Sequence, residues 1–215
     1  MTETSDTKQE ILNVSLNLFS TQGYEATSVS QIAEAVGIRK ASLYSHFASK
    51  QAILDELMKI TLGQYERHSI FINDYFGNAD VTNADITKDK EDIAPDKAIQ
   101  MIVGQIRYIL QDQKISRGRK MLTIEQFRNS QMAAFQTKQN YTEVMQFFTD
   151  MIRYLIGCGR LKNGEVEIMA AQLCLPISVW INLCDREPKR IDEVMSLVER
   201  HVRHFFKIYG QSLQE

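Results

Sequence analysis

Residues 28–50, SVSQIAEAVGIRKASLYSHFASK, decide the fold expected for this chain. Ser28 and Gln31 stand three positions apart, the spacing of a capping box, so a helix is predicted to begin directly after Ser28. Gly37 predicts the end of that helix and a tight turn, since glycine tolerates the left-handed conformation that closes many helices. A second short helix then covers about residues 39–47. Two short helices joined in this way form a helix-turn-helix.

The second helix of this pair has an apolar side and a polar side. Leu43 on this helix, with Ala33 and Ile38 before it, is expected to pack inward. Between Glu34 and Asp55 the chain carries basic side chains and no carboxylate. A short polar helix of this kind fits the major groove of duplex DNA, although the same shape also occurs as a plain helical hairpin. The coincidence of capping box, turn glycine and basic outer side favours DNA binding.

Contacts to bases and phosphates are predicted from the outer side of this segment. Arg39 and Lys40, at the start of the second helix, can reach base edges or flanking phosphates. Lys50 lies in the first turn of the following helix, where a cation opposes the helix dipole unless a phosphate binds there. The full set of predicted DNA contacts is Thr27, Ser28, Arg39, Lys40, Ser42, Tyr44, His46 and Lys50.

The composition of the whole chain limits the classes of protein to consider. The 215 residues carry a formal net charge of −2, which argues against a protein that coats nucleic acid without sequence preference. The sequence holds no apolar run of the ~20 residues needed to cross a bilayer, and its polar, acidic N-terminus is not a secretory signal. We therefore expect a cytoplasmic protein that does not span a membrane. Its cysteines are expected to be buried, reduced thiols: Cys158, Cys174 and Cys184.

The rest of the chain is predicted to be mostly helical. A first helix over residues 7–22 ends at Gly23, and Ser49 caps a long helix that continues to about residue 72. Residues 77–96 are rich in acidic side chains and hold no aromatic one, so a solvated loop is expected there. Apolar periodicity predicts further helices over 99–110, 117–135, 144–156, 165–184 and 189–209.

The first quarter of the chain, from ILNVSLNLFS at residue 11 to KQAIL at residue 54, resembles the N-terminal domain of the TetR family of bacterial transcriptional regulators. Two positions depart from the family pattern. Arg39 stands where the family commonly has a serine or threonine that caps the second helix, and Ser15 stands where a small apolar residue is usual. The matching residues are Ile11, Leu12, Leu18, Phe19, Gly23, Tyr24, Thr27, Ile32, Ala33, Ala35, Gly37, Leu43, Tyr44, His46, Phe47, Ser49 and Lys50.

The resemblance implies an all-α protein of about nine helices, with a helix-turn-helix DNA-binding domain at 1–48 and a helical ligand-binding and dimerisation domain at 49–215. It implies a transcriptional repressor that binds a palindromic double-stranded DNA operator as a homodimer and is released by a small-molecule inducer. The helices near 165–184 and 189–209 are apolar enough to pair with their copies in a four-helix bundle.

The ligand pocket is only weakly marked in the sequence. Aromatic and methionine side chains line apolar pockets, but at helical spacing the same residues equally form ordinary core. The candidates for a pocket lining are Met101, Tyr108, Phe127, Tyr141, Phe148 and Met151.

Two other functions stay open at this point. A DNA-binding protein of the same fold without a small-molecule inducer shares all of the N-terminal features. An all-helical enzyme is disfavoured, because the sequence contains no glycine-rich phosphate loop and no nucleophile motif, and its histidines are too scattered for a metal site. No cofactor, catalytic residue or metal ligand is predicted.

Overall fold

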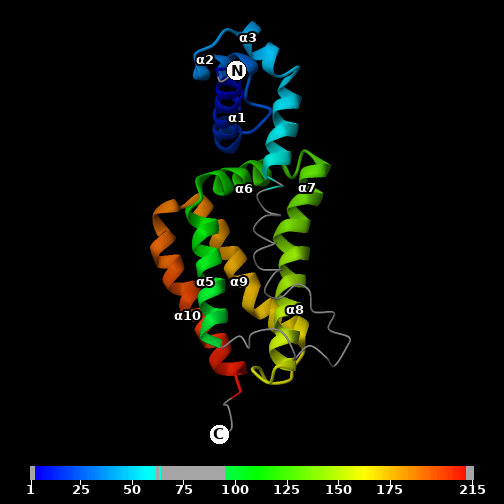
Figure 1. Ribbon diagram of the computed structural model, residues 1–215, viewed down its shortest axis with the longest axis vertical. Coiled ribbons are helices and arrows are strands. Elements are labelled where there is room, and N and C mark those ends of the chain that lie inside the picture. Colours follow the sequence, from blue (N-terminus) through cyan, green and yellow to red (C-terminus); the bar gives the residue numbers. More distant parts are fainter. Residues whose placement is uncertain (1–2, 62, 64–94, 212–215) are drawn as a thin grey trace. The chain divides into compact units, whose positions relative to one another are not determined.

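The computed structural model describes residues 3–61, 63 and 95–211, and these residues form helices (Figure 1). This confirms the predicted all-α fold, with a helix-turn-helix near the N-terminus and a helical C-terminal part. Apart from an isolated bridge between Leu161 and Gly210, the described residues form no extended pairing. The loop predicted over 77–96, except for its last two residues, lies outside the described residues. So does the continuation of the long helix beyond residue 63.

The described residues divide into two compact units. Unit 1 contains residues 3–61 together with 113–136, and unit 2 contains residues 95–112 together with 137–211. The domain boundary predicted between residues 48 and 49 therefore falls inside unit 1. The physical reason is that helices from the middle of the chain complete the core around the helix-turn-helix.

The N-terminal part of unit 1 follows the prediction closely. Its elements are α1 (Glu3–Gln22), α2 (Val29–Val36), α3 (Lys40–His46) and a helix over residues 50–61. α1 begins earlier than predicted and ends as predicted before Gly23, whose φ of 89° is left-handed. Ser49 caps the helix over 50–61, since its Oγ accepts the N–H of Ala52 at 3.1 Å.

α6 (Gln113–Glu125) and α7 (Ser130–Thr137) complete unit 1. The sequence predicted a single helix over 117–135, and this prediction is wrong, because the chain breaks the helix at residues 126–129. Asn129 starts the second helix. Its side-chain Oδ1 accepts two N–H groups in the first turn of α7, at 3.0 and 3.2 Å.

α6 and α7 share one apolar core with the helix-turn-helix. Met121 and Leu122 of α6 and Met132 of α7 are at most 1% exposed in this core. Gly118 lets α6 approach the helix over 50–61 closely, since a Cβ at Gly118 would lie 3.0 Å from Cγ2 of Thr61. The other buried members are Ile11, Leu12, Leu16, Phe19, Ile32, Ala33, Leu43, Phe47, Ile53, Leu54, Leu57 and Phe135.

Ser15 is a fully buried residue of α1, and its hydroxyl oxygen has no hydrogen-bond partner among the described residues. Leaving a buried hydroxyl unpaired costs about 1–3 kcal/mol, and alanine is also a slightly better helix former than serine. We therefore expect Ser15→Ala to raise the free energy of unfolding of unit 1 by about 1 kcal/mol, as measured by urea denaturation.

Ser20→Ala is the matched control for this substitution. The Ser20 hydroxyl is also buried in α1, but it donates to the carbonyl of Asn17 at 2.9 Å. The control variant is expected to be no more stable than the wild type, because it loses that bond. A Ser15→Ala protein that unfolds at a lower urea concentration than the wild type would contradict the assignment of an unsatisfied hydroxyl.

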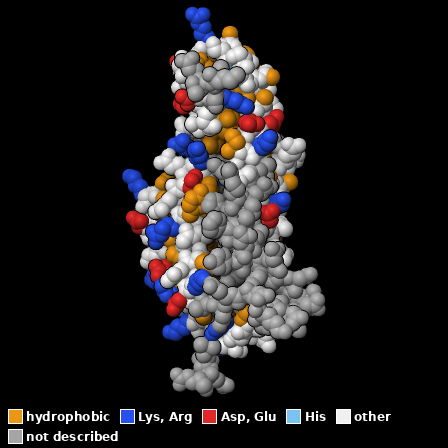
Figure 2. Space-filling model, in the orientation of Figure 1, with side chains coloured by type: hydrophobic (Ala, Val, Ile, Leu, Met, Phe, Trp, Pro, Cys, Tyr) orange, Lys and Arg blue, Asp and Glu red, His pale blue; other side chains and the backbone are white. Residues whose placement is uncertain are grey.

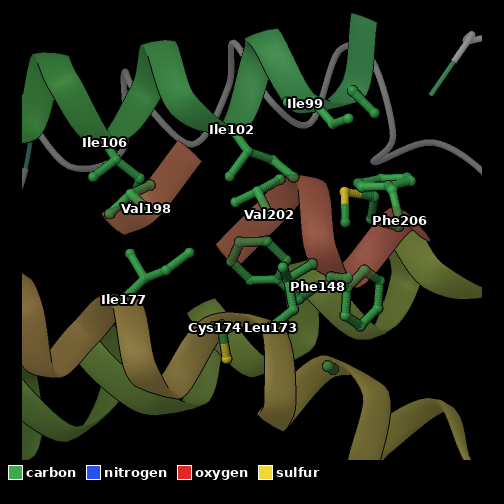
Figure 3. Packing of buried hydrophobic residues seen from close by; sticks show 14 of the residues in the cluster. Ile99, Ile102, Ile106, Phe148, Leu173, Cys174, Ile177, Val198, Val202 and Phe206 are labelled. Carbon is green, nitrogen blue, oxygen red and sulfur yellow. The ribbon is translucent and has the colours of Figure 1, made fainter. Parts of the chain in front are cut away.

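Helices from four stretches of the chain form the core of unit 2: α5 (Pro95–Gln111), α8 (Glu143–Gly157), α9 (Val166–Arg186) and α10 (Ile191–Tyr209). A π-helical turn (Lys138–Thr142) precedes α8, and a 3₁₀ turn (Pro188–Arg190) precedes α10. Figure 3 shows isoleucines of α5 facing residues of α10, with α8 and α9 residues beside them. The residues in view include Ile99, Ile102, Ile106, Phe148, Leu173, Cys174, Ile177, Val198, Val202 and Phe206.

None of the three cysteines, all of which lie in the described residues, takes part in a disulfide. Cys174 and Cys184 are buried, as predicted, and Cys158 is half-buried. Burial raises the pKa of the Cys174 thiol to about 11, so this thiol stays protonated at neutral pH. Cys174 therefore acts as an apolar core residue.

α9 has an apolar side that points away from the core of unit 2. Ile168, Leu175 and Val179 lie seven and four residues apart on this side and are 52%, 38% and 63% exposed. Among the described helices, α9 is long and apolar enough to cross a membrane by length and composition, and 28% of that stretch is buried. Core helices of soluble proteins meet the same criterion, so it is weak evidence for a membrane span.

Candidate nucleic-acid interface

Hydrogen bonds at both ends of α2 fix the helix-turn-helix. The Oγ of Ser28 accepts the N–H of Gln31 at 3.2 Å, and the Oε1 of Gln31 accepts the N–H of Ser28 at 2.7 Å, so the predicted capping box is confirmed. At the other end, Gly37 has a φ of 79°, and the N–H of Ile38 donates to the carbonyl of Ala33 at 2.9 Å. This Schellman pattern makes the turn that leads into α3.

α3 has one side in the core and the other in solvent. Leu43 is fully buried in the core that contains Ile32 and Ala33 of α2, as predicted. Figure 2 shows a lysine or arginine side chain projecting from the end of unit 1 where α3 lies. The exposed positions at α3 include Arg39, Lys40, Ser42 and Tyr44, and His46 is half-buried. The structure thus brings the predicted contacts of α3 onto one accessible surface.

Thr27 requires a correction to the predicted contacts. Its side chain is 1% exposed, and its hydroxyl donates to the carbonyl of Gly23 at 2.7 Å and accepts a bond from Nε2 of Gln22 at 3.0 Å. This contradicts the phosphate contact predicted for the hydroxyl, because the hydroxyl proton is used inside the turn between α1 and α2. Ser28, the next residue, is exposed at the start of α2.

Lys50 supports the same turn from the helix over 50–61. Its Nζ donates to the carbonyl oxygens of Tyr24 and Thr27 at 2.7 and 2.9 Å and lies 4.0 Å from the centre of the Tyr24 ring. The sequence predicted that this ammonium group faces a phosphate. Instead, two of its three N–H groups are used within unit 1, which leaves one for a phosphate.

Glu125, the last residue of α6, reaches the same turn, and sequence reasoning missed it. Its side chain is 3% exposed, and its Oε1 accepts the N–H of Tyr24 at 2.8 Å. Tyr24 also donates its hydroxyl to Oε1 of Gln51 at 3.1 Å. Burial, followed by the carboxylates of Glu25, Asp55 and Glu125, raises the pKa of the Tyr24 phenol, so it remains a donor. No local signal marks Glu125, because 101 residues separate it from Tyr24.

Residues 11–57 match the family model described as bacterial regulatory proteins, tetR family. Over these residues the chain is similar to the DNA-binding domain of TetR-family regulators. It is 39% identical over 59 residues to the HTH-type transcriptional regulator AcrR of Shigella flexneri, a segment that covers 27% of each chain. It is 44% identical over 52 residues to IcaR of Staphylococcus aureus, the HTH-type negative transcriptional regulator of the biofilm operon icaADBC, covering 24% of this chain and 28% of IcaR. The sequence match to these TetR-type relatives thus spans about a quarter of their length.

The fold of the whole chain is similar to that of SmeT in its complex with triclosan. The TM-score is 0.67 at 14% sequence identity, and the alignment covers 97% of this chain and 93% of the SmeT chain. SmeT is the repressor of the Stenotrophomonas maltophilia multidrug efflux pump SmeDEF. At this identity the likeness concerns the fold alone, and it extends the agreement beyond the TetR DNA-binding domain into the helical C-terminal part.

Arg39 is where the chain departs from the TetR pattern at α3. It is the N-cap of α3, with φ −71° and ψ 146°, and its side chain makes no capping hydrogen bond, as predicted. The start of α3 therefore lacks the acceptor that a serine or threonine supplies, at a cost of about 1 kcal/mol. The exposed guanidinium instead stands beside Lys40 on the accessible surface.

The candidates for a pocket lining do not share one environment. Phe148 and Met151 lie in the core of unit 2, 8% and 0% exposed, and Met101 packs against that core. Their burial fits both alternatives that the sequence left open, an ordinary core and the lining of an enclosed pocket. The remaining candidates are surface residues, 40%, 89% and 56% exposed: Tyr108, Phe127 and Tyr141.

Proposed function

We propose that this chain is a transcriptional repressor of the TetR type, which binds a palindromic DNA operator as a homodimer and leaves it when a small molecule binds in unit 2. The observation that carries the proposal is α3 itself. Its sequence, KASLYSH, has no acidic side chain. The Gly37 turn and the buried Leu43 fix its inner side, and its outer side carries side chains that can donate hydrogen bonds. A helix built in this way suits the acceptor-rich floor and walls of the major groove.

The proposed contacts divide by the position of each side chain. Arg39 and Lys40, in the first turn of α3, are placed to reach base edges or the nearest phosphates. Ser28 offers an exposed hydroxyl at the start of α2, while Tyr44 and His46 are long enough to reach the sugar–phosphate backbone. Contacts to the backbone set the register, and the contacts of α3 to the bases set the operator sequence.

The proposed dimer forms through the apolar side of α9, together with α10. Ile168, Leu175 and Val179 are exposed in one copy, and burying such side chains contributes about 25 cal/mol per Å² of apolar surface removed from water. A second copy related by a two-fold axis would cover them with the same residues. Two-fold symmetry also supplies two α3 helices for successive major grooves, which lie ~34 Å apart on one side of DNA.

Regulation by a small molecule is the part of the proposal supported by SmeT, whose solved structure contains triclosan. A DNA-binding protein without an inducer is the competing function, in which Phe148 and Met151, 8% and 0% exposed, would be ordinary core residues. Thermal unfolding of the protein with triclosan and with a panel of other apolar compounds separates the two. A ligand that raises the unfolding temperature and also weakens DNA binding supports induction.

Selection of duplexes from a random pool by the purified protein tests the proposed function directly. We expect the selected sequences to be palindromes with half-site centres about 10 base pairs apart, or a multiple of this. DNase footprinting then locates the same palindrome in genomic DNA upstream of a gene. Recovery of no preferred sequence from the pool would overturn the proposal.

A further inference from the structure

We propose that Glu125 is a positioning residue for DNA binding: its carboxylate fixes the turn between α1 and α2 to α6 and so holds the helix-turn-helix ready for the major groove. The inference rests on the proposed function, and it goes beyond that function because Glu125 lies in α6, far along the chain from every predicted DNA contact. Glu125 acts through the backbone of Tyr24, not through DNA.

The contacts around Tyr24 carry the first step of the argument. Its N–H donates to Glu125 at 2.8 Å, and its carbonyl accepts from Lys50 at 2.7 Å. A carboxylate from α6 and an ammonium group from the helix over 50–61 therefore hold the two polar groups of one backbone residue. Hydrogen bonds to ionised groups are stronger than those between neutral groups, so this residue is firmly placed. Phe19 adds an edge-on ring contact at 5.3 Å.

The connection from Tyr24 to α3 carries the second step. Lys50 also binds the carbonyl of Thr27, and Thr27 directly precedes Ser28, the N-cap of α2. α2 in turn is joined rigidly to α3 through the Gly37 turn and the buried Leu43. A shift of the turn at Tyr24 therefore moves the start of α2 and, with it, the outer side of α3.

Close packing around Gly23 carries the third step. A Cβ at Gly23 would lie 3.1 Å from Oε1 of Glu125 and 3.2 Å from Cγ2 of Ile124. The end of α6 thus sits against the backbone of the turn, with little space for the turn to relax. A side chain without an acceptor at position 125 would leave the Tyr24 N–H unpaired beside an apolar group, and the turn would adjust to regain a partner.

The test compares Glu125→Leu with Glu125→Gln, because glutamine keeps an acceptor oxygen and a similar shape. The probe is a fluorescein-labelled duplex that carries the best sequence selected by the wild-type protein. We expect Glu125→Leu to bind it about tenfold or more weakly, with an unchanged slope of log affinity against log salt, since no phosphate contact is lost. Glu125→Gln is expected to stay within about threefold of the wild type. Hydrogen exchange of the Tyr24 amide is expected to speed up in the leucine variant only.

Leu122→Ala is the matched control for general loss of stability, because Leu122 is a 1% exposed core residue of α6 whose apolar side chain makes no hydrogen bond to the turn. Equal weakening of DNA binding by this variant and by Glu125→Leu would overturn the proposal. So would wild-type affinity in Glu125→Leu, a changed salt slope, or a loss in Glu125→Gln as large as that in Glu125→Leu. If the wild type selects no duplex, the proposed function fails instead, and the amide exchange of Tyr24 still reports whether Glu125 holds the turn.

Discussion

Val179→Asp is expected to convert the protein into a monomer and to weaken binding to its palindromic operator by about 100-fold or more. Val179 is 63% exposed in one copy and is the most exposed residue of the apolar side of α9 that the proposed dimer would bury. An aspartate buried in that interface would place an unpaired charge from each copy among apolar side chains, which costs several kcal/mol. A monomer then loses the gain in affinity that comes from binding two half-sites at once.

Sedimentation velocity measures the oligomeric state of this variant, and gel-shift titration of the palindrome measures its affinity. Tyr141→Asp is the matched control, because Tyr141 is also an exposed apolar side chain, 56% exposed, but lies outside α9. It is expected to remain a dimer with wild-type affinity. A Val179→Asp protein that still sediments as a dimer at micromolar concentration would show that this side of α9 is not the interface.

The double substitution Arg39→Ala with Lys40→Ala is expected to weaken operator binding by about 100-fold and to reduce the salt dependence. Each dimer loses four positive charges, two from each α3. For every one of them that binds a phosphate, the slope of log affinity against log salt falls by about 0.9. Those that bind a base instead leave the slope unchanged and relax the sequence preference at one position of each half-site.

Lys59→Ala is the control for the change in net charge. Lys59 is exposed on the helix over 50–61, about two and a half turns after Lys50. Its removal is expected to alter affinity by less than about twofold, because a distant exposed charge is screened at physiological salt. Equal effects of the double substitution and of Lys59→Ala would mean that α3 does not contact DNA.

The features predicted correctly from the sequence are those set by neighbouring residues. The side chains of Ser28 and Gln31 accept each other's backbone N–H groups within four residues. Gly37 adopts a left-handed conformation because it has no Cβ to clash with the backbone. The inward position of Leu43 follows from helical periodicity. Each of these signals lies within one helix or turn, so the sequence contains it in full.

The features missed are those that join distant parts of the chain. Glu125 meets Tyr24 across 101 residues, and an isolated glutamate at the end of a helix looks no different from a solvent-exposed one. The break between α6 and α7 was also missed. The Asn129 side chain caps α7, but an asparagine in the sequence does not by itself show whether it lies inside a helix or at its start. For Thr27 and Lys50, the residue types were compatible with phosphate contacts, but their polar atoms have partners inside unit 1. Those of Thr27 lie within its own turn, and those of Lys50 lie 23 and 26 residues away.

The discontinuous make-up of unit 1 has a consequence for how the protein is synthesised and how it can be recombined. Met121, Leu122 and Met132 belong to the same core as Phe19 and Leu43. The core of unit 1 therefore cannot form completely until roughly two-thirds of the whole chain has been translated. For the same reason, residues 1–57 grafted alone onto a foreign regulator would expose the apolar surface that α6 and α7 cover in this protein. A graft that also carries residues 113–136 would transfer the module whole.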